Sequence, residues 1–455
     1  MEKDLEKRKE NKMGTMPVKQ LIVSMSLPMM VSMLVQALYN VVDSIFVAKI
    51  SEDALTAVTL AFPMQNLMIA LAAGTGVGVN SLLSRSLGEK RFDKSDAAAN
   101  TAILLTIFNF VIFFIAGTFG AKAFISTQTK DAAIISDGAT YLGIVCTLSL
   151  GLFFQVTFER LLQSTGRTIY SMVSQLVGAV INIIFDPIMI FGLLGCPKLG
   201  VAGAAYATVL GQSIAAVVGF VLNIKFNHDI RLHIKEVIKI KPGIIGEVYW
   251  VGVPSILMMS IGSVMTYAMN QILIRFSTTA TAVFGVYFKL QSFFFMPIFG
   301  MNNGVIPVLA YNYGAKSKAR INEALKFALV LAVSIMSFGT VVFELIPNLL
   351  LRLFNASDEM LSIGIVALRI IAIHFPIAAI SIVMGTIFQA FAKSIYSLII
   401  SVGRQLVVLI PVAFLLSLSG NLNAVWFAFP IAESVSLVLS LTFFKKVYKE
   451  TVAQL

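Results

Sequence analysis

The chain has 455 residues, of which 58% are hydrophobic and only 13% are charged, whereas soluble domains average roughly 45–50% apolar and about 25% charged residues. Its mean hydropathy is +0.88, so it has too few polar residues to cover a soluble surface. A net charge of +11 would suit a nucleic-acid partner, but the distribution of lysines and arginines along the chain argues against one. We therefore expect a polytopic protein of the lipid bilayer.

Twelve apolar blocks follow one another along the chain, each long enough for the roughly 20 residues of a membrane-spanning helix. They are continuous and much longer than the roughly 10-residue alternating segments of a membrane β-barrel, so an all-α polytopic membrane protein is predicted. The predicted spans are residues 18–46, 54–84, 95–120, 133–158, 168–194, 200–224, 243–276, 279–311, 322–350, 359–390, 395–418 and 424–444.

The segments between these spans differ in charge. If the amino terminus lies inside, the inner segments hold 24 lysines and arginines and the outer loops hold 6. Cytoplasmic loops carry such an excess, so both termini are expected in the cytoplasm. The opening MEKDLEKRKENK does not resemble a signal peptide, so the first span should stay in the mature chain. The two cysteines, Cys146 and Cys196, lack the spacing of a metal site or a disulfide framework, and we assign them no role.

The chain contains an internal repeat with a constant offset in residue number. The stretch GTGVGVNSLLSRSLGEK, which begins at Gly74, aligns with GMNNGVIPVLAYNYGAK, which begins at Gly300. The same offset relates Pro28 to Pro254 and the two IYS tripeptides at 169–171 and 395–397. Each half holds six predicted spans, and an even number returns the chain to its starting side, so the halves are parallel repeats.

This organisation predicts two six-helix lobes, which is the architecture of an alternating-access carrier. We expect an amino-terminal lobe with a cytoplasmic tail at 1–224, a cytoplasmic interlobe loop at 225–242 and a carboxyl-terminal lobe at 243–455.

Polar residues recur at helical spacing in three spans of the first half. The first span carries Gln36, Asn40 and Asp43, the fifth carries Gln175, Asn182 and Asp186, and the sixth carries Thr208 and Gln212. Spacings of three, four and seven place each set on one helix face. These faces could simply join helices through hydrogen bonds, which are worth about 0.6 kcal/mol on average, and Asp43 could lie at the outer membrane interface. Neither alternative explains why an ionisable carboxylate, Asp186, should lie deep within an apolar span.

The repeat provides an internal control for the two aspartates. In the second copy, Asp43 corresponds to Met269, which is followed by Asn270, and Asp186 corresponds to Val412. The fold therefore does not demand acids at these positions, and their presence in one half predicts cation coupling there. Carboxylates in a medium of low dielectric bind protons more readily, so a proton is the favoured ion, with sodium at the same oxygens as the alternative. Pro28 removes a backbone hydrogen bond from the first span and predicts a helix bend that could respond to protonation.

The second half has buried charges of its own. We expect Arg369 and Arg404 to pair with Glu433 or with backbone carbonyls, because charges inside a span need partners. Lys289 stands in VYFKLQSFFFMPIFG beside Phe293 and Met296. These three residues could line a substrate cavity, or the lysine could meet a helix-end carbonyl while the apolar side chains pack in the core or face lipid.

Three stretches resemble the repeated signatures of the multidrug and toxic compound extrusion (MATE) family: YNVVDSIFVAKISEDALTAV (39–58), NIIFDPIMIFGLLGCPKLGVAGAAYAT (182–208) and PVLAYNYGAKSKARINEA (307–324). The resemblance covers both halves and is greatest to the bacterial subgroup that includes the staphylococcal multidrug exporter. It implies a two-lobed antiporter of the bacterial plasma (inner) membrane, which expels bulky, mostly cationic organic compounds while protons or sodium run inward.

The resemblance also implies roles for individual residues, with no cofactor beyond the coupling ion, no dedicated metal site and a monomeric protein. Some similar proteins carry a carboxylate in the seventh helix and another in the tenth, but TYAMNQILIRF and LRIIAIHFPIA contain none. The coupling group expected here is Asp43, Asp186, Asn182 and Thr208. We expect the substrate to meet Gln36, Tyr39, Asn40, Tyr141, Asn270, Lys289, Phe293 and Met296.

Two competing functions remain at this point. An intramembrane enzyme is a remote alternative, because His228, His233 and His374 form no HExxH motif and GTGVG lacks the Lys-Ser/Thr of a phosphate loop. A flippase for a lipid-linked or amphipathic substrate has the same architecture and is the closer alternative. Such a protein should offer several cavity cations to a phosphate, and only Lys289 is an evident candidate.

Overall fold

The computed structural model describes residues 10–354 and 356–455, so residues 1–9 of the expected cytoplasmic tail lie outside the described residues. The helices of the first half are α2 (Lys12–Thr15), α3 (Val18–Ala48), α4 (Glu52–Gly88), α5 (Phe92–Ile115), the π-helical η1 (Ala116–Gly120), α6 (Ala121–Ser126), α7 (Ala132–Thr147), α8 (Leu150–Ser164), α9 (Thr168–Phe191) and α10 (Val201–Phe226).

The second half begins after a connecting segment. Its helices are α11 (Ile234–Val237), α12 (Pro242–Leu273), α13 (Thr278–Gly314), α14 (Lys318–Leu345), α15 (Pro347–Arg352), α16 (Asp358–Ala372), α17 (Phe375–Ala390), α18 (Ser394–Val402), the π-helical η2 (Gly403–Leu409), α19 (Ile410–Ser417), α20 (Leu422–Trp426), α21 (Ala428–Glu450) and the 3₁₀ turn η3 (Val452–Gln454).

Within the described residues, ten continuous helical segments are long and apolar enough to cross a membrane, and two bent helix pairs raise the number to twelve. The pairs α7–α8 and α16–α17 each bend by 47°. The second bend has a local cause, because Pro376 stands in the first turn of α17. A proline there costs α17 no hydrogen bond, but it prevents α16 from continuing as the same helix. The predicted twelve-span helical fold is confirmed, and the fourth and tenth spans are broken helices.

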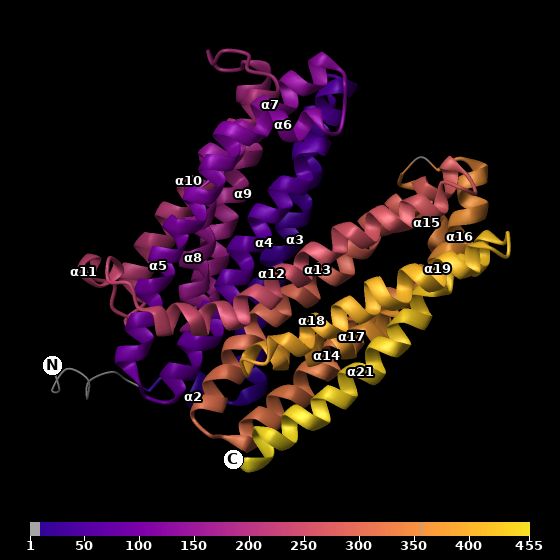
Figure 1. Ribbon diagram of the computed structural model, residues 1–455. Helices are drawn as coiled ribbons and strands as arrows, with labels where there is room; N and C mark the ends of the chain where they lie inside the picture. Colours follow the sequence, from indigo (N-terminus) through magenta and orange to yellow (C-terminus); the bar gives the residue numbers. More distant parts are fainter. Residues whose placement is uncertain (1–9, 355) are drawn as a thin grey trace.

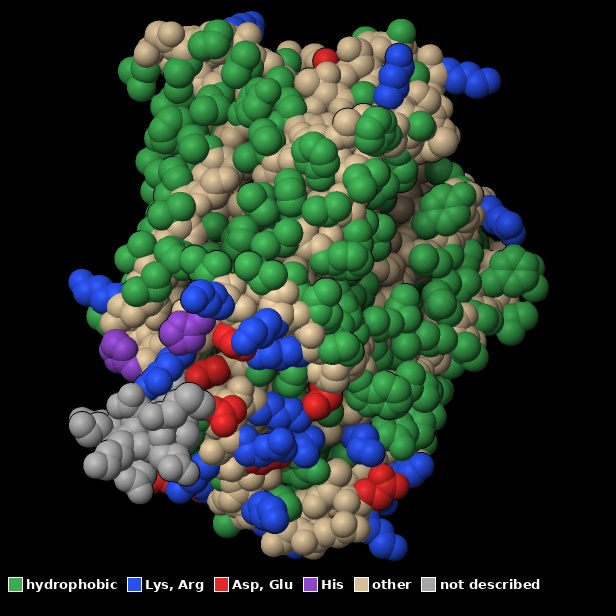
Figure 2. All heavy atoms as spheres, turned by 60° about the vertical axis from the view of Figure 1, so that its left-hand side comes forward, with side chains coloured by type: hydrophobic (Ala, Val, Ile, Leu, Met, Phe, Trp, Pro, Cys, Tyr) green, Lys and Arg blue, Asp and Glu red, His purple; other side chains and the backbone are tan. Residues whose placement is uncertain are grey.

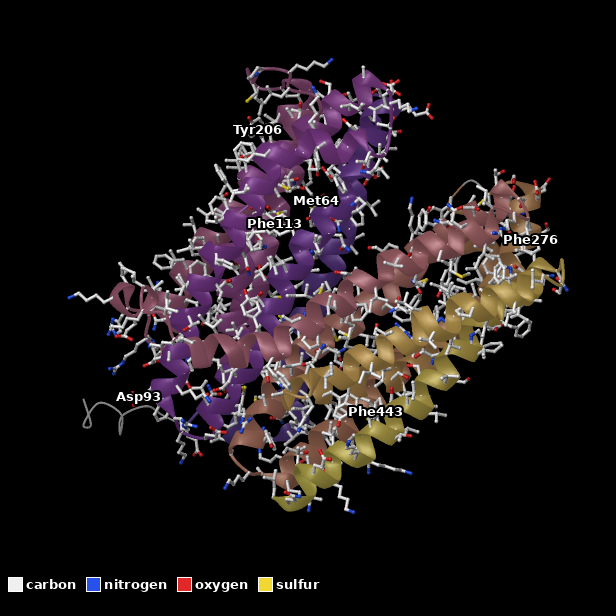
Figure 3. The ribbon with its side chains drawn as sticks, viewed as in Figure 1. Met64, Asp93, Phe113, Tyr206, Phe276 and Phe443 are labelled. Atoms are coloured by element: carbon white, nitrogen blue, oxygen red, sulfur yellow. The ribbon has the colours of Figure 1, made fainter. Side chains whose placement is uncertain are left out.

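The helices form two lobes that lie close together at one end and diverge toward the other (Figure 1). The close end holds α2 and the carboxyl terminus. Asp93 at the start of α5 lies near this end, whereas Tyr206 near the start of α10 lies at the far end of the same lobe (Figure 3). Figure 2 shows hydrophobic side chains over the middle of one face and charged side chains gathered toward the close end, as expected for a molecule encircled by lipid.

The repeat is visible in the local structure of α4 and α13. Both helices have 37 residues, and each begins at a serine whose hydroxyl accepts a hydrogen bond from the backbone N–H three residues on. Ser51 caps α4 and Ser277 caps α13, both at 3.0 Å. Each helix is followed by a lysine in the left-handed conformation, with φ of 58° at Lys90 and 55° at Lys316. The repeat relates both the two serines and the two lysines, so the same N-cap chemistry starts both copies.

Repeated glycines bring the two lobes together. Gly300 and Gly304 of α13 lie against the backbone of α3, where an added Cβ would come within 2.5 Å of the Met29 oxygen and 2.7 Å of the Met25 oxygen. Their counterparts in α4, Gly74 and Gly78, lie against α12 in the same way. Small residues permit such close helix approach in membranes. The lobe contact is therefore made by two related pairs, α4 with α12 and α13 with α3.

The short helix α2 joins the lobes at the close end. Asn11 Nδ2 donates to the Thr165 oxygen in the amino-terminal lobe over 2.9 Å. From the other lobe, Asn312 Nδ2 donates to the Met13 oxygen over 3.1 Å, and Arg320 Nη2 donates to the same oxygen over 2.9 Å. Met13 itself is fully buried. This segment fastens the end at which the lobes are packed.

Candidate cation-coupling site

The polar faces predicted from the sequence meet inside the amino-terminal lobe, where α9 packs between α3 and α10. Asp186 is fully buried, and Asn182 and Thr208 are 3% and 6% exposed. Asn182 Nδ2 lies 3.4 Å from Asp186 Oδ1 and 3.3 Å from Thr208 Oγ1. With the amide turned over, its nitrogen donates to Asp186 Oδ2 at 3.3 Å and its oxygen accepts from the Thr208 N–H at 3.2 Å. We adopt the turned amide, because it satisfies both groups.

The carboxyl of Asp43 reaches across from α3 to that of Asp186. The two side chains lie within hydrogen-bonding reach of each other, although an ionised carboxylate has no proton to donate. Two such groups can share a hydrogen bond only if one carries a proton, and two negative charges at this separation repel strongly in a medium of low dielectric. Asp43 Oδ1 is buried and has no partner among the described residues. A cation on the pair would relieve this repulsion.

Two tyrosines border the carboxyl pair. Tyr39 of α3 and Tyr141 of α7 both interact electrostatically with Asp43 and Asp186. Tyr141 is 2% exposed and also bonds with Gln65 of α4. Both were predicted to meet the substrate, and that role stays a prediction. The structure places them near the acids.

The two other predicted residues of α3 point in different directions. Gln175 Nε2 of α9 donates to Gln36 Oε1 over 3.1 Å, so Gln36 is bound within its own lobe. Asn40 is exposed. Of the two, only Gln36 is therefore held against α9.

The carboxyl-terminal candidates lie apart from the acids. Asn270 of α12 and Met296 of α13 are half-buried, Lys289 is exposed and Phe293 is 40% exposed. None of them bonds to the carboxyl pair among the described residues, so their role in substrate binding stays a prediction. Pro28 also stays a prediction, since α3 continues as one helix from Val18 to Ala48 and the 47° bends lie in other spans.

The expected partners of the charges in the second half are present, but the expectation that these charges are all buried is wrong, because Arg369 is exposed and Arg404 is half-buried. Arg404 Nη1 donates to Glu433 Oε2 over 3.0 Å, and Arg369 Nε donates to the Glu344 backbone oxygen over 3.2 Å. His374 Nδ1 lies 4.0 Å from the same Glu433 oxygen. This cluster has one carboxylate facing basic groups, which differs from the acid pair in the other lobe.

Two ionisable residues of α8 were missed. Arg160 was counted among the cytoplasmic loop charges, but it is 8% exposed inside the helix, as is its neighbour Glu159. Arg160 Nη1 donates to Asn303 Oδ1 of the other lobe over 2.9 Å, and Gln155 donates to Glu159 over 3.0 Å. The predicted span ended just before these two residues, because hydropathy falls at the charges themselves.

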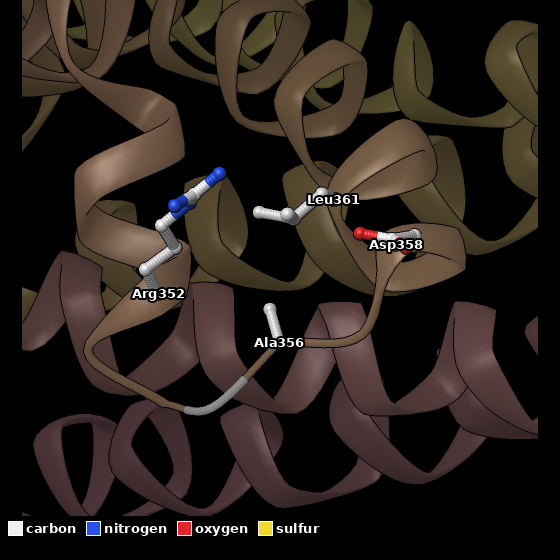
Figure 4. A pocket seen from close by; sticks show the side chains of 4 residues that line it. All are labelled: Arg352, Ala356, Asp358 and Leu361. Atoms are coloured by element: carbon white, nitrogen blue, oxygen red, sulfur yellow. The ribbon is translucent and has the colours of Figure 1, made fainter.

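Other locations offer less for a ligand. A pocket of about 440 Å³ lies between α15 and α16 in the carboxyl-terminal lobe (Figure 4), lined by Arg352, Ala356, Asp358 and Leu361. It is remote from the acid pair, and Arg352 already donates to Asn348. No group of three or more His, Cys, Asp or Glu residues that could hold a metal occurs in residues 10–354 and 356–455. A sodium ion at the acid pair would draw on carboxyl, amide and hydroxyl oxygens of the four predicted coupling residues.

A family model described as MatE matches residues 28–188 and again 254–415. The chain belongs to the MATE transporter family. The two matches begin at Pro28 and Pro254, which are the prolines that the internal repeat relates. It is accordingly a multi-pass membrane transporter rather than an enzyme.

Curated relatives of this MATE chain are distant but match over most of the length. It is 26% identical over 419 residues to Multidrug export protein MepA of Staphylococcus haemolyticus, covering 91% of each chain. It is 25% identical over 435 residues to Probable multidrug resistance protein YoeA of Bacillus subtilis, covering 94% of each chain.

Solved structures show the same fold. An outward-facing multidrug resistance MATE family transporter superposes with a TM-score of 0.92 at 24% identity, covering 98% of this chain and 99% of the other. A MATE structure described as straight gives a TM-score of 0.91 at 24% identity, with 98% of this chain and all of the other covered. These comparisons establish the fold of the two lobes.

Proposed function

We propose that this MATE transporter is a secondary antiporter that exports bulky, mostly cationic organic compounds by alternating access, in exchange for a cation bound at Asp43 and Asp186. The proposal rests on one observation above all: the half-buried carboxyl of Asp43 lies within hydrogen-bonding reach of the fully buried Asp186, and Asp43 Oδ1 is buried without a partner among the described residues. Ionisable groups inside membrane spans mark ion pathways. The names of the curated relatives support export of drug-like compounds.

The restriction of the acids to one lobe supports coupling rather than a structural role. Met269 and Val412 stand at the equivalent positions of the other lobe, although both lobes fold into the same arrangement. Acids that the fold required would occur twice. A proton is the favoured ion, because contact between two carboxyls becomes a hydrogen bond when one is protonated, and sodium is the alternative.

The divergence of the lobes supports alternating access. Helices α3 and α13 are in close contact near Gly300 and Gly304 and separate toward the other end (Figure 1). If the close end, which carries α2 and the carboxyl terminus, faces the cytoplasm of a bacterial plasma membrane, the chain has the outward-facing form. We propose that it acts as a monomer, with lobes at 1–224 and 243–455 joined by the 225–242 loop.

The flippase alternative is less well supported. A lipid-linked phosphate needs several cations near its path. Helices α3 and α13 contain two basic residues. Lys289 lies where the helices have separated, whereas Lys19 lies at the start of α3, near the close end. One cation suits a small organic compound better than a phosphorylated lipid head group.

The test is replacement of each acid by its amide. Asp43→Asn and Asp186→Asn keep size and hydrogen-bonding capacity but remove the titratable charge. We expect folded protein in normal amounts and loss of ion-driven uptake of a fluorescent organic cation into inverted vesicles, under the gradient that drives the wild type. Asp53→Asn, at the exposed start of α4, is the matched control and should transport normally.

Transport by both amide variants at the wild-type rate, under a proton gradient and under a sodium gradient, would overturn the amino-lobe coupling site. Activity under only one of the two gradients in the wild type identifies the ion.

A further inference from the structure

The surfaces along which the lobes separate can be identified by following the contact helices outward. Gly300 of α13 touches Met29 of α3. Three helical turns are about 11 residues, so Asn40 of α3 and Lys289 of α13 stand three turns beyond this contact on the same faces. Both are exposed, because the helices have separated at that height. We call the exposed or half-exposed continuations of this contact the interlobe faces. They consist of Ala37, Asn40 and Ser44 on α3 and Ala282, Lys289 and Phe293 on α13.

Lys289 is the charged residue of the interlobe faces. No hydrogen bond or ion pair of its ammonium exists among residues 10–354 and 356–455 as described. The helix opposite Lys289 is α3. Its acid, Asp43, is directed at Asp186 in α9. An ammonium inside a span without a fixed counter-charge is costly unless water or a ligand meets it.

The neighbours of Lys289 specify a ligand with two parts. Phe293 lies one turn closer to the contact on the same face and is 40% exposed, so it offers an aromatic surface. Asn40 stands opposite at the same height and offers amide donors. An ammonium and an amide facing each other, with a phenyl ring beside them, match an aromatic compound that carries a carboxylate.

We propose that the interlobe faces bind the anionic group of amphoteric or acidic aromatic compounds, with Lys289 as its counter-charge. This rests on the proposed export function and deepens it, since it adds carboxylate-bearing compounds to the cationic ones. The anion pairs with Lys289 while the cationic part of an amphoteric compound remains free to be drawn toward the amino-terminal lobe. Opposite charges in the two lobes would then orient the compound between them.

Equilibrium binding to a matched dye pair tests the proposal. The full chain in lipid nanodiscs, without any gradient, is titrated with a xanthene dye that has a free carboxylate and with the methyl ester of the same dye, using fluorescence anisotropy. We expect the wild type to bind the acid more tightly. Lys289→Gln should weaken binding of the acid by about three- to tenfold, as for a partly hydrated ion pair, and leave the ester within about twofold.

Two further variants complete the design. Lys289→Arg keeps the charge and should keep the preference for the acid. Lys122→Gln removes an exposed lysine of α6 in the other lobe and should change neither affinity. No binding of either dye, equal wild-type affinities, or an equal effect of Lys289→Gln on both dyes would overturn the proposal. Because no gradient is involved, failure of the coupling variants in vesicles would leave this binding result unaffected, and the two proposals fail separately.

Discussion

Arg160 of α8 donates a hydrogen bond to Asn303 of α13 over 2.9 Å, and this bond joins the two lobes. Both residues are 8% exposed. Gly76 of α4 makes room for the arginine, since an added Cβ would lie 2.6 Å from its Cγ. A guanidinium stays charged even when buried, so its acceptors hold a charge in place across the lobe boundary. We infer that this bond helps to keep the close end closed.

Loss of the acceptor should therefore loosen the close end. Asn303→Val keeps the shape but leaves Arg160 with Gln163 alone. A hydrogen bond to a charged group contributes about 1.5–3 kcal/mol, and we expect a loss of stability of that order in thermal unfolding of the detergent-solubilised protein.

The adjacent asparagine is the control. Asn302 Oδ1 is buried without a partner among the described residues, so Asn302→Val should change stability far less. Equal effects of the two substitutions would show that the bond to Arg160 carries no special weight.

The close approach of α13 to α3 predicts a steric effect at Gly304. A Cβ there would lie 2.7 Å from backbone atoms of Met25, which cannot rotate away as a side chain could. Gly304→Ala should destabilise the protein by about 1–3 kcal/mol through overpacking and reduce transport by displacing one lobe from the other.

Gly285→Ala in the same helix is the comparison, because nothing lies within 4 Å of its added Cβ. Alanine has the higher helix propensity by roughly 1 kcal/mol, so this variant should be at least as stable as the wild type in the same unfolding assay. A stable Gly304→Ala protein would contradict the assigned contact.

The Arg404–Glu433 pair predicts a structural effect rather than a coupling effect. Glu433 is 2% exposed and accepts from Arg404 over 3.0 Å. Removing one partner of a fully buried pair costs about 3–5 kcal/mol. The Arg404 side chain is 28% exposed, so Glu433→Gln should cost less than this but still lower the amount of folded protein. Transport normalised to folded protein should remain coupled. Normal folding with uncoupled transport would instead move the coupling site to the carboxyl-terminal lobe.

The charge bias predicts that the interlobe segment faces the cytoplasm. Lys235 of α11 is exposed, so Lys235→Cys in a Cys196→Ser background should react with a membrane-impermeant thiol reagent in inverted vesicles and not in intact cells. Lys122→Cys, in a predicted outer segment, should show the opposite pattern. Labelling of Lys235→Cys from outside would reverse the orientation.

The same segment is held by ion pairs that should persist through the labelling conditions. Hydrogen bonds from Lys239 and Lys241 lower the pKa of Glu236 from 4.5 to about 2. A group whose pKa is lowered by folding adds stability that is fully present above its unfolded value and is lost as the pH falls through its folded value. We therefore expect the reactivity of Lys235→Cys, corrected for thiol ionisation, to show no change in the segment's structure between about pH 5 and about pH 8.

Local chemistry along the chain was enough to predict much of the fold. Spans, their number and the repeat follow from hydropathy and spacing, because a helix in lipid satisfies its own backbone and must be apolar over its length. Two kinds of feature were missed. Bends within a span, as at Pro376, leave hydropathy unchanged, and charges at a helix end, as at Arg160, lower hydropathy although the helix continues.

The candidate site was predicted in part. The spacing of Asn182 and Asp186 fixed their common face, because residues four apart in a helix are neighbours. It could not show that Asp43 meets Asp186, since that contact depends on how α3 crosses α9, and the two residues belong to spans that are far apart in the sequence.

The sequence by itself determined the set of apolar helices, their duplication and the placement of the acids in one half only. Each of these can be read from residue type and position along the chain. Tertiary structure alone decided which polar faces meet, which are held apart and which lysine remains exposed between them. Gln36 and Asn40 lie four residues apart in one helix, yet Gln36 bonds to α9 and Asn40 is exposed. The physical reason is that contacts between helices depend on their crossing and separation, which small residues such as Gly300 set by permitting close approach at one height and not at another.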